Sequence, residues 1–143
     1  MATTPVVEIL GGEKVLRRKV SSPLKLVEAV REGLPYSSLQ AVMDALGLSR
    51  QEASRVLSLP LRTLDRRKRQ RRLQALESDR LYRLANIATR AIDVLGSPHH
   101  AALWLRSPNR ALGGVVPLEL LDTELGAEQV DEILGRIEYG MYS

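Results

Sequence analysis

The chain has 143 residues, of which 44% are hydrophobic and 27% are charged, and its formal net charge at pH 7 is +4. This composition is sufficient for a hydrophobic core and excludes a chain that is disordered throughout. The absence of Cys excludes a disulfide framework and any cysteine nucleophile or metal ligand. No apolar run approaches the ~18 residues of a membrane-spanning helix, and the N-terminus does not resemble a secretion signal, so we expect a cytoplasmic protein.

Charge is distributed unevenly along the chain. Residues 1–96 hold 18 Lys and Arg against 10 Asp and Glu, a net charge of +8, whereas residues 97–143 carry a net charge of −4. A basic segment favours polyanionic partners, because neutralising phosphates releases their counterions. The asymmetry therefore predicts two surfaces for two kinds of partner.

The first elements differ in how clearly the sequence defines them. Residues 1–24 are predicted to be a loosely held arm, with a short strand over residues 6–10, a turn at Gly11-Gly12 and a basic cluster at residues 17–19. A helix is predicted over residues 24–32, because its apolar residues share one face at helical spacing.

The next segment carries the pattern of a helix-turn-helix. Apolar residues at helical spacing predict a helix that begins with a cap at Ser37 or Ser38 and ends at Gly47. Ser49 and Glu52 then form the capping box of a second helix. Residues 50–57 are the predicted positioning helix, residues 58–60 the turn and residues 61–72 the recognition helix, whose first turn is opened by Pro60.

Residues 61–72 read LRTLDRRKRQRR, and seven of these twelve residues are Arg or Lys. With Leu64 facing inward, the residues predicted to reach base edges are Arg62, Asp65 and Arg66. Thr63 is predicted to contact a phosphate or to pack. The residues predicted to hold phosphates are Arg67, Lys68, Arg69, Arg71 and Arg72. The alternative is a solvated basic helix face without a ligand. One such unit contacts few base pairs, so specific binding requires a homodimer on a two-fold site.

The C-terminal part is predicted to be helical as well. A helix begins near residues 77–79 and ends at Gly96, Ser97-Pro98 starts a short helix that contains Trp104 as a core residue, and the last helix spans residues 126–138. With no strand after residue 20, the predicted fold is all-α. The predicted domains are an arm with a first helix, a helix-turn-helix domain and a C-terminal helical domain, at residues 1–35, 36–78 and 79–143.

The end of the chain has features of an interface. Tyr139 and Tyr142 are two of five aromatic residues in the protein, and Arg136 lies close before them. Tyr and Arg dominate the residues that contribute most to protein–protein binding. The alternative, that both tyrosines cover the core of their own chain, has equal weight on residues alone.

Residues 107–140 contain an ordered set of short motifs: Pro108-Asn109, Leu112-Gly113-Gly114, Pro117 to Leu121, Thr123-Glu124, Gly126 and Leu134 to Gly140. In this order they resemble the toxin-binding domain of the Xre/MbcA/ParS-type antitoxins that accompany RES-domain toxins. The resemblance extends more loosely over residues 36–106, where that family has an Xre-like helix-turn-helix. The departures from the pattern are Ser58 and Pro60 in the turn.

This resemblance implies a bacterial antitoxin that binds an NAD-depleting RES toxin, blocks its active site and represses its own operon. The toxin contacts that it implies are Arg136, Glu138, Tyr139 and Tyr142. It also implies operator DNA as a second partner.

Nothing in the sequence indicates an enzyme. The only histidines, His99 and His100, are neighbours and point about 100° apart on a helix, so they are poorly placed to share a metal. We therefore expect no catalytic residue, no metal and no cofactor. The alternative function is a transcriptional regulator whose C-terminal half only dimerises or senses a ligand. An RNA-binding role is disfavoured, because no aromatic platform for bases is visible.

Overall fold

The computed structural model describes residues 3–140, and within this range the chain forms α-helices and short 3-10 helices but no β-strand. The elements, in chain order, are α1 (Thr3–Ile9), α2 (Gly12–Leu16), α3 (Pro23–Glu32), α4 (Tyr36–Leu46), α5 (Arg50–Leu57), α6 (Leu61–Gln70), α7 (Ala75–Leu95), α8 (Pro98–Arg106), η1 (Arg110–Leu112), η2 (Pro117–Leu120) and α9 (Glu124–Glu138). The predicted all-α fold, with a helix-turn-helix domain followed by a helical domain, is confirmed.

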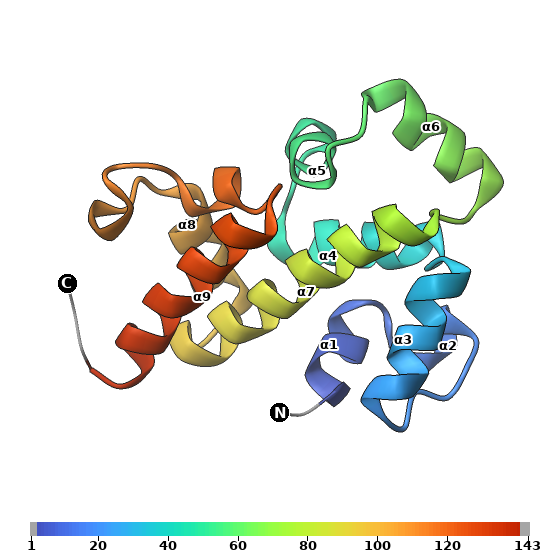
Figure 1. Cartoon of the computed structure of the whole chain (residues 1–143), viewed down its shortest axis with the longest axis horizontal. Helices are drawn as coiled ribbons and strands as arrows, with labels where there is room; N and C mark the ends of the chain where they lie inside the picture. Colours follow the sequence, from blue (N-terminus) through green and yellow to red (C-terminus); the bar gives the residue numbers. More distant parts are fainter. Residues whose placement is uncertain (1–2, 141–143) are drawn as a thin grey trace.

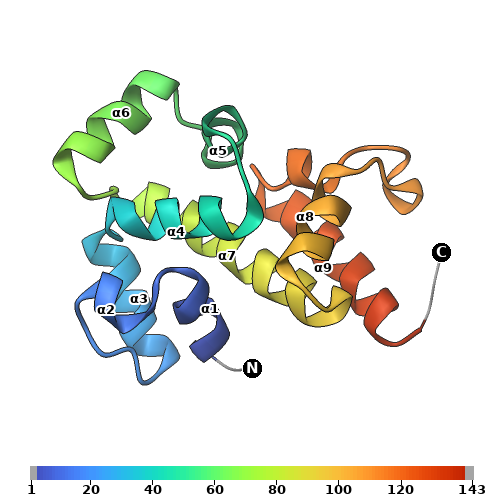
Figure 2. The ribbon, with the colours of Figure 1, turned by 180° about the vertical axis from the view of Figure 1, so that it is seen from behind.

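Helix α7 runs through the middle of the molecule and is the element around which the others pack (Figures 1 and 2). It contacts α1, α3, α4 and α5 on the N-terminal side and α8 and α9 on the C-terminal side. Its buried stripe combines Leu and Ile with the small residues Ala85, Ala88 and Ala91, which let neighbouring helices approach closely. The helix begins at Ala75 and crosses the boundary predicted near residues 77–79, so that division into domains stays a prediction.

The first residues do not form the loosely held arm and strand that we predicted. Residues 3–9 are helical, and Val6, Val7 and Leu10 are buried with exposed fractions of 1%, 3% and 0%. A short apolar run fits either a strand or a helix, and packing of α1 against α7 and α4 decides in favour of the helix.

Most of the predicted helix ends are confirmed. Ser49 and Ser97 cap α5 and α8 through their side chains, and Gly47 and Gly96 end α4 and α7 in the left-handed conformation. Ser22, which was not predicted as a cap, caps α3 in the same way. The predicted cap at Ser37 or Ser38 is wrong. Pro35 precedes α4 instead, and Ser38 lies fully buried inside that helix.

The junction between α3 and α4 packs directly on the segment that follows α6. Leu73 N–H donates to the carbonyl of Leu34 over 2.9 Å, and Leu34 N–H donates to the hydroxyl of Ser78 over 2.7 Å. A Cβ at Gly33 would lie 2.2 Å from the carbonyl oxygen of Leu73, and Gly33 has a φ of +98°. Only glycine allows this close approach, which closes the helix-turn-helix unit.

An ion pair joins the N-terminal helices to α8. Arg106 donates from Nε to Oε2 of Glu52 over 3.0 Å and from Nη2 to Oε1 over 2.9 Å, and it also donates to the carbonyl of Gly47. The pKa of the Glu52 carboxyl falls from 4.5 to about 2, mainly because of the Arg106 hydrogen bonds. Burial acts in the opposite direction, while hydrogen bonds from Ser49 and the charge of Arg106 lower the pKa further.

We predict that Arg106→Met lowers the free energy of unfolding at pH 7 by about 1–2 kcal/mol, a value reduced for solvent screening because the pair is partly exposed. A depressed carboxyl pKa stabilises the fold above pH 4.5, and this contribution is lost as the pH falls toward 2. The difference between wild type and variant should therefore shrink over that interval. Urea unfolding at several pH values measures it, with Arg110→Met as an exposed control. A difference that stays constant down to pH 2 contradicts the prediction.

Candidate functional sites

The turn between α5 and α6 has helix-turn-helix geometry although it lacks glycine. Ser58 ends α5 in the left-handed conformation, with φ 53° and ψ 46°. Its N–H donates to the carbonyl of Arg55, and the hydroxyl of Ser54 donates to the carbonyl of Leu59. Pro60 then precedes α6 with a φ of −59°. The departures at Ser58 and Pro60 are therefore accommodated by the backbone.

Helix α6 buries one face and exposes the other. Leu64 and Thr63 are buried with exposed fractions of 1% and 8%, so Thr63 packs. Because a helix turns about 100° per residue, residues on the side of α6 opposite Leu64 point away from the core. The exposed polar residues of the helix are Arg62, Asp65, Arg66, Lys68, Arg69 and Gln70.

One predicted base-reading residue is already engaged within the chain. The carboxylate of Asp65 accepts a hydrogen bond of 2.5 Å from Arg50, the first residue of α5. This exposed pair links the two helices of the motif at the surface. Arg62 and Arg66 lie on the exposed side of α6 as predicted.

The prediction that Arg67 holds a phosphate is wrong. Its side chain is buried, and Nε and Nη2 donate to the two carboxylate oxygens of Glu77 over 2.7 and 2.8 Å. Burial alone would raise the pKa of Glu77, but the hydrogen bonds from Arg67 and from the backbone of Gln74, together with the charge of Arg67, lower it. Arg67 therefore joins α6 to the start of α7 and does not reach solvent.

The recognition helix is also shorter than predicted. It ends at Gln70, and Arg71 leaves the helix with a φ of 64°. Arg72 donates from Nη1 to the carbonyl of Gly33 over 2.5 Å. Both arginines remain exposed, so they extend the basic surface beyond the end of α6.

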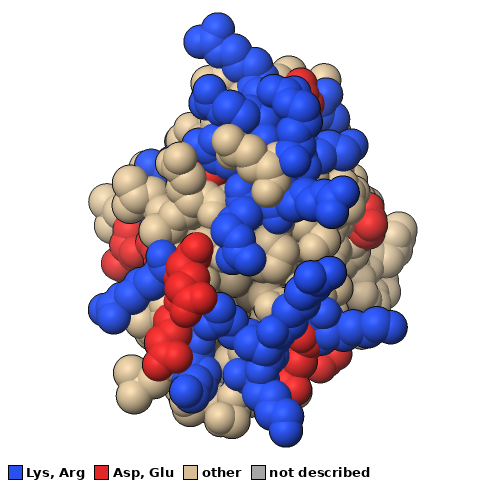
Figure 3. Space-filling model, turned by 90° about the vertical axis from the view of Figure 1, so that its right-hand side faces the viewer, with Lys and Arg blue, Asp and Glu red and all other residues tan. Residues whose placement is uncertain are grey.

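Figure 3 shows the face of the molecule that carries α6, α3 and α2, and Lys and Arg side chains gather over most of it. They lie over α6 at the top and continue downward over α2 and α3, where acidic side chains lie among them. A face that is rich in Lys and Arg is the electrostatic footprint expected of a protein that binds a nucleic acid.

The second candidate surface lies on the C-terminal helices. Thr123 caps α9 by accepting a hydrogen bond from Gly126 N–H over 2.9 Å. A Cβ at Gly126 would lie 1.9 Å from the carbonyl oxygen of Leu120, so glycine is required where α9 starts against η2. Before η2, the side chain of Asn109 accepts from Ala111 N–H and its backbone pairs with Val115, which folds residues 109–115 into a tight loop.

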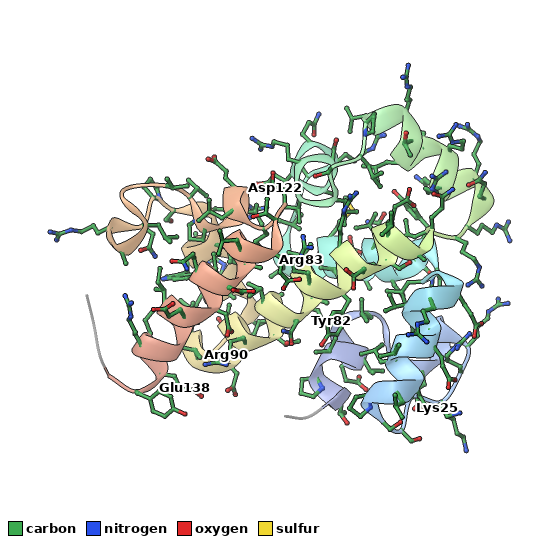
Figure 4. The ribbon with its side chains drawn as sticks, viewed as in Figure 1. Lys25, Tyr82, Arg83, Arg90, Asp122 and Glu138 are labelled. Atoms are coloured by element: carbon green, nitrogen blue, oxygen red, sulfur yellow. The ribbon has the colours of Figure 1, made fainter. Side chains whose placement is uncertain are left out.

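Charged pairs hold α9 against α7 (Figure 4). Arg90 on α7 lies 3.1 Å from Glu138 and 3.6 Å from Asp131, both on α9. Arg83, about two turns before Arg90 on α7, donates to the carbonyl of Leu121 over 3.4 Å. Glu138, one of the predicted toxin contacts, therefore also fixes the end of α9.

The other predicted toxin contacts lie near the same helix end. Arg136 pairs with Glu132 over 2.8 Å on the surface of α9. Tyr139 is 74% exposed, so it does not cover the core of its own chain. Tyr142 lies outside the described residues. Trp104 is half-buried and packs against the hydrophobic core, as predicted.

Three exposed apolar residues in this half were not predicted as site residues. Leu103, Val115 and Leu125 are 54%, 38% and 68% exposed. For Leu103 a signal was present in the sequence, because Ala101 and Leu105 define the buried side of α8 and a residue between them faces outward. Exposed apolar side chains of this size are candidates for contacts with a partner protein.

The two surfaces lie at opposite ends of the long axis of the molecule. Helix α6 is at one end, and the loop of residues 109–115 and the end of α9 are at the other, in both views (Figures 1 and 2). Among residues 3–140 there is no helix long and apolar enough to cross a membrane, and no cluster of three or more potential metal ligands.

Comparison with known families agrees with this two-part organisation. Residues 25–86 match the antitoxin Xre-like helix-turn-helix domain, and residues 90–140 match the antitoxin Xre/MbcA/ParS C-terminal toxin-binding domain. The two matches meet within α7.

Curated relatives that align with this chain over most of their length are named as antitoxins. The chain is 33% identical to antitoxin Xre of Photorhabdus laumondii over 125 residues, which is 86% of this chain and 84% of the relative. It is 29% identical to antitoxin Xre of Yersinia enterocolitica over 91% of this chain and 92% of the relative. A protein of Sphingobium sp. named Prs ADP-ribosylating antitoxin is 27% identical over 86% of this chain and 84% of the relative.

The fold and its two surfaces thus define a helix-turn-helix protein with a C-terminal toxin-binding domain. The chain belongs to the Xre family of antitoxins, with a toxin and DNA as the partners that these domains imply.

We predict that Arg67→Met destabilises the fold by about 3–5 kcal/mol, because it leaves the carboxylate of Glu77 buried without its partner. For a chain of this size the melting temperature should fall by roughly 10 °C. Circular dichroism during heating measures this, with the exposed neighbour substitution Arg66→Met as the control. Adding Glu77→Gln should recover part of the loss. Equal melting temperatures for Arg67→Met and Arg66→Met would show that the pair does not hold α6.

Proposed function

We propose that the protein is an antitoxin that binds and inhibits a cognate RES-domain, NAD-depleting toxin in the cytoplasm and represses its own operon through the helix-turn-helix. The observation that carries this proposal is the placement of a basic recognition helix and a toxin-binding domain at opposite ends of one molecule. Partners at the two ends need not exclude each other. The protein acts by binding rather than by catalysis.

For the DNA-binding half, α6 supplies the recognition surface. Arg62 and Arg66 lie on its exposed side near the N-terminal end, which is the end that enters the major groove in this motif. Arginine recognises guanine through a bidentate contact to O6 and N7. The carboxylate of Asp65 orients Arg50 at the start of α5. It also places a hydrogen-bond acceptor on the side of α6 that faces the base edges.

Phosphate contacts come from the remaining exposed basic residues. Lys68 and Arg69 lie on α6, and Arg71 and Arg72 lie just beyond its end. Such contacts fix the register of the protein on the duplex without reading its sequence. Since one α6 reaches few base pairs, we expect a homodimer on a two-fold operator.

For the toxin-binding half, the end of α9 is the proposed contact surface. Tyr139 presents a largely exposed ring beside Arg136, and the pair of Glu138 with Arg90 keeps the last turn in place. A large aromatic side chain on a fixed helix end loses little conformational freedom on binding. We propose Tyr142 as a further toxin contact, three residues after Tyr139.

We predict that Arg69→Ala weakens binding to the DNA upstream of its own coding sequence and lowers the slope of log K against log salt by about 1. Arg66→Ala should weaken binding more on the operator than on unrelated duplexes, because a base contact carries specificity. Fluorescence anisotropy over a salt series measures both variants, with Arg110→Ala at the far end of the molecule as the control. An unchanged slope for Arg69→Ala places that residue away from DNA.

We predict that Tyr139→Ala, or removal of residues 136–143, abolishes neutralisation of the proposed cognate RES-domain toxin and leaves operator binding intact. Co-purification of the two proteins and cellular NAD content are the measurements. Tyr139→Phe should retain neutralisation if the ring area is what binds, and Arg66→Ala should retain it because α6 lies at the other end. Truncated protein that still restores NAD would disprove this interface.

A further inference from the structure

Three residues other than glycine have a positive φ among the described residues: Arg17 at 57°, Ser58 at 53° and Arg71 at 64°. Each of them ends a helix, namely α2, α5 and α6. The left-handed conformation is unfavourable for a residue with a Cβ, and proteins usually place glycine there. This chain itself uses glycine in that position after α4 and α7.

Retaining arginine at two such positions has a conformational cost that a glycine would avoid. Backbone strain that persists in a fold points to a side chain that is needed for something other than stability. Both arginines are exposed. Arg71 lies at the end of the recognition helix, whereas Arg17 precedes residues 25–86, the segment that matches the helix-turn-helix domain.

The two arginines belong to one surface although 54 residues separate them in the sequence. The carbonyl of Arg71 accepts from Tyr36 N–H over 3.1 Å, which places the end of α6 on the junction after α3. At the last residue of α3, Glu32 pairs with Arg18 over 2.5 Å. The pKa of the Glu32 carboxyl is lowered by the hydrogen bonds and charge of Arg18 and also by the charge of Arg72. Arg72, just after α6, donates to the carbonyl of Gly33, the residue next to Glu32, so the segments that follow α2 and α6 both contact the end of α3.

The loop after α2 is ordered without help from its exposed basic residues. Val20 N–H donates to the carboxylate of Glu13 over 2.8 Å, and Leu16 and Val20 are buried on either side of the loop. Arg17 and Lys19 project from this fixed loop into solvent. Figure 3 shows Lys and Arg side chains over α6 and also over α2 and α3 on this face, with acidic side chains among those over α2 and α3.

The acidic groups on this surface are largely engaged. Glu13 accepts from the backbone of Val20, Glu32 pairs with Arg18, and Glu28 lies 3.7 Å from Lys25. Arg17, Lys19 and Arg71 thus supply positive charge that these carboxylates do not neutralise at close range. A fixed row of cations continuous with a recognition helix suits the sugar–phosphate backbone of a duplex, whose charges are regularly spaced.

We propose that Arg17 and Lys19, on the loop after α2, continue the phosphate contacts of Arg71 as a second phosphate-binding surface, which contacts the backbone of duplex DNA next to the base pairs read by α6. This inference rests on the proposed DNA binding and adds to it a contact from the N-terminal helices. The two strained arginines are retained because their charges bind phosphate, and glycine would be the better residue for the fold alone.

The test uses Arg17→Gly and Arg71→Gly in the full chain, because glycine keeps the backbone conformation and removes the charge. Each variant should keep or raise the melting temperature and lose roughly fivefold in affinity at 0.15 M salt, with the slope of log K against log salt lower by about 1. Arg17→Lys, which keeps the charge, should bind like wild type. Binding is also measured on duplexes that are shortened stepwise from each end. Removing the base pairs whose phosphates Arg17 contacts should lower the affinity of wild type and leave the affinity of Arg17→Gly unchanged.

A lower melting temperature with unchanged DNA affinity would assign Arg17 to stabilising the end of α2 and overturn the inference. Loss of affinity for single-stranded RNA but not for duplex DNA would overturn it as well. Wild-type protein that binds no DNA would overturn the proposed DNA binding and this surface together. Wild type that binds DNA with a salt slope equal to that of Arg17→Gly would overturn only this surface.

Discussion

The guanidinium of Arg67 and the carboxylate of Glu77 face each other in the interior, joined by two hydrogen bonds of 2.7 and 2.8 Å. Apart from this contact, α6 buries little more than Thr63 and Leu64. Glu77 also accepts from Gln74 N–H and so caps α7. One carboxylate therefore fixes both the recognition helix and the start of the central helix. Removing either partner leaves a buried charge unpaired, which makes the position of α6 depend on this pair.

The central helix connects this arrangement to the other end of the molecule. Helix α7 contacts the N-terminal helices along one part and α8 and α9 along another, and Arg106 on α8 reaches back to Glu52 on α5. The positioning helix of the DNA-binding motif is thus bound to the toxin-binding half through a bidentate pair. The two ends are held on one framework, which suits a protein whose proposed partners bind at both ends.

Two groups of positions differ in what their backbone conformation requires: at some, packing demands glycine, and at others a larger residue stands where glycine would cost less. Gly33 and Gly126 are needed because a Cβ would collide with a carbonyl oxygen. Ser58, Arg17 and Arg71 adopt a conformation that glycine would adopt at lower cost. Within residues 3–140, these three residues end α2, α5 and α6, and the two arginines carry positive charge.

The sequence by itself determined the helical class, the positioning helix at residues 50–57, most helix ends and the outward direction of Arg62 and Arg66. These follow from local rules, since spacing, capping residues and glycine act within a few positions of the chain. Only the tertiary structure decided that residues 3–9 are a helix and that Arg67 is buried. Val6 and Val7 fit a strand or a helix until α7 covers them. Helical spacing places Arg67 on the same face as Leu64, but only folding brings Glu77, ten residues away, near enough to bind its guanidinium in the interior. A basic run specifies charge, whereas the packing of α6 against α7 decides which of its arginines reaches a partner.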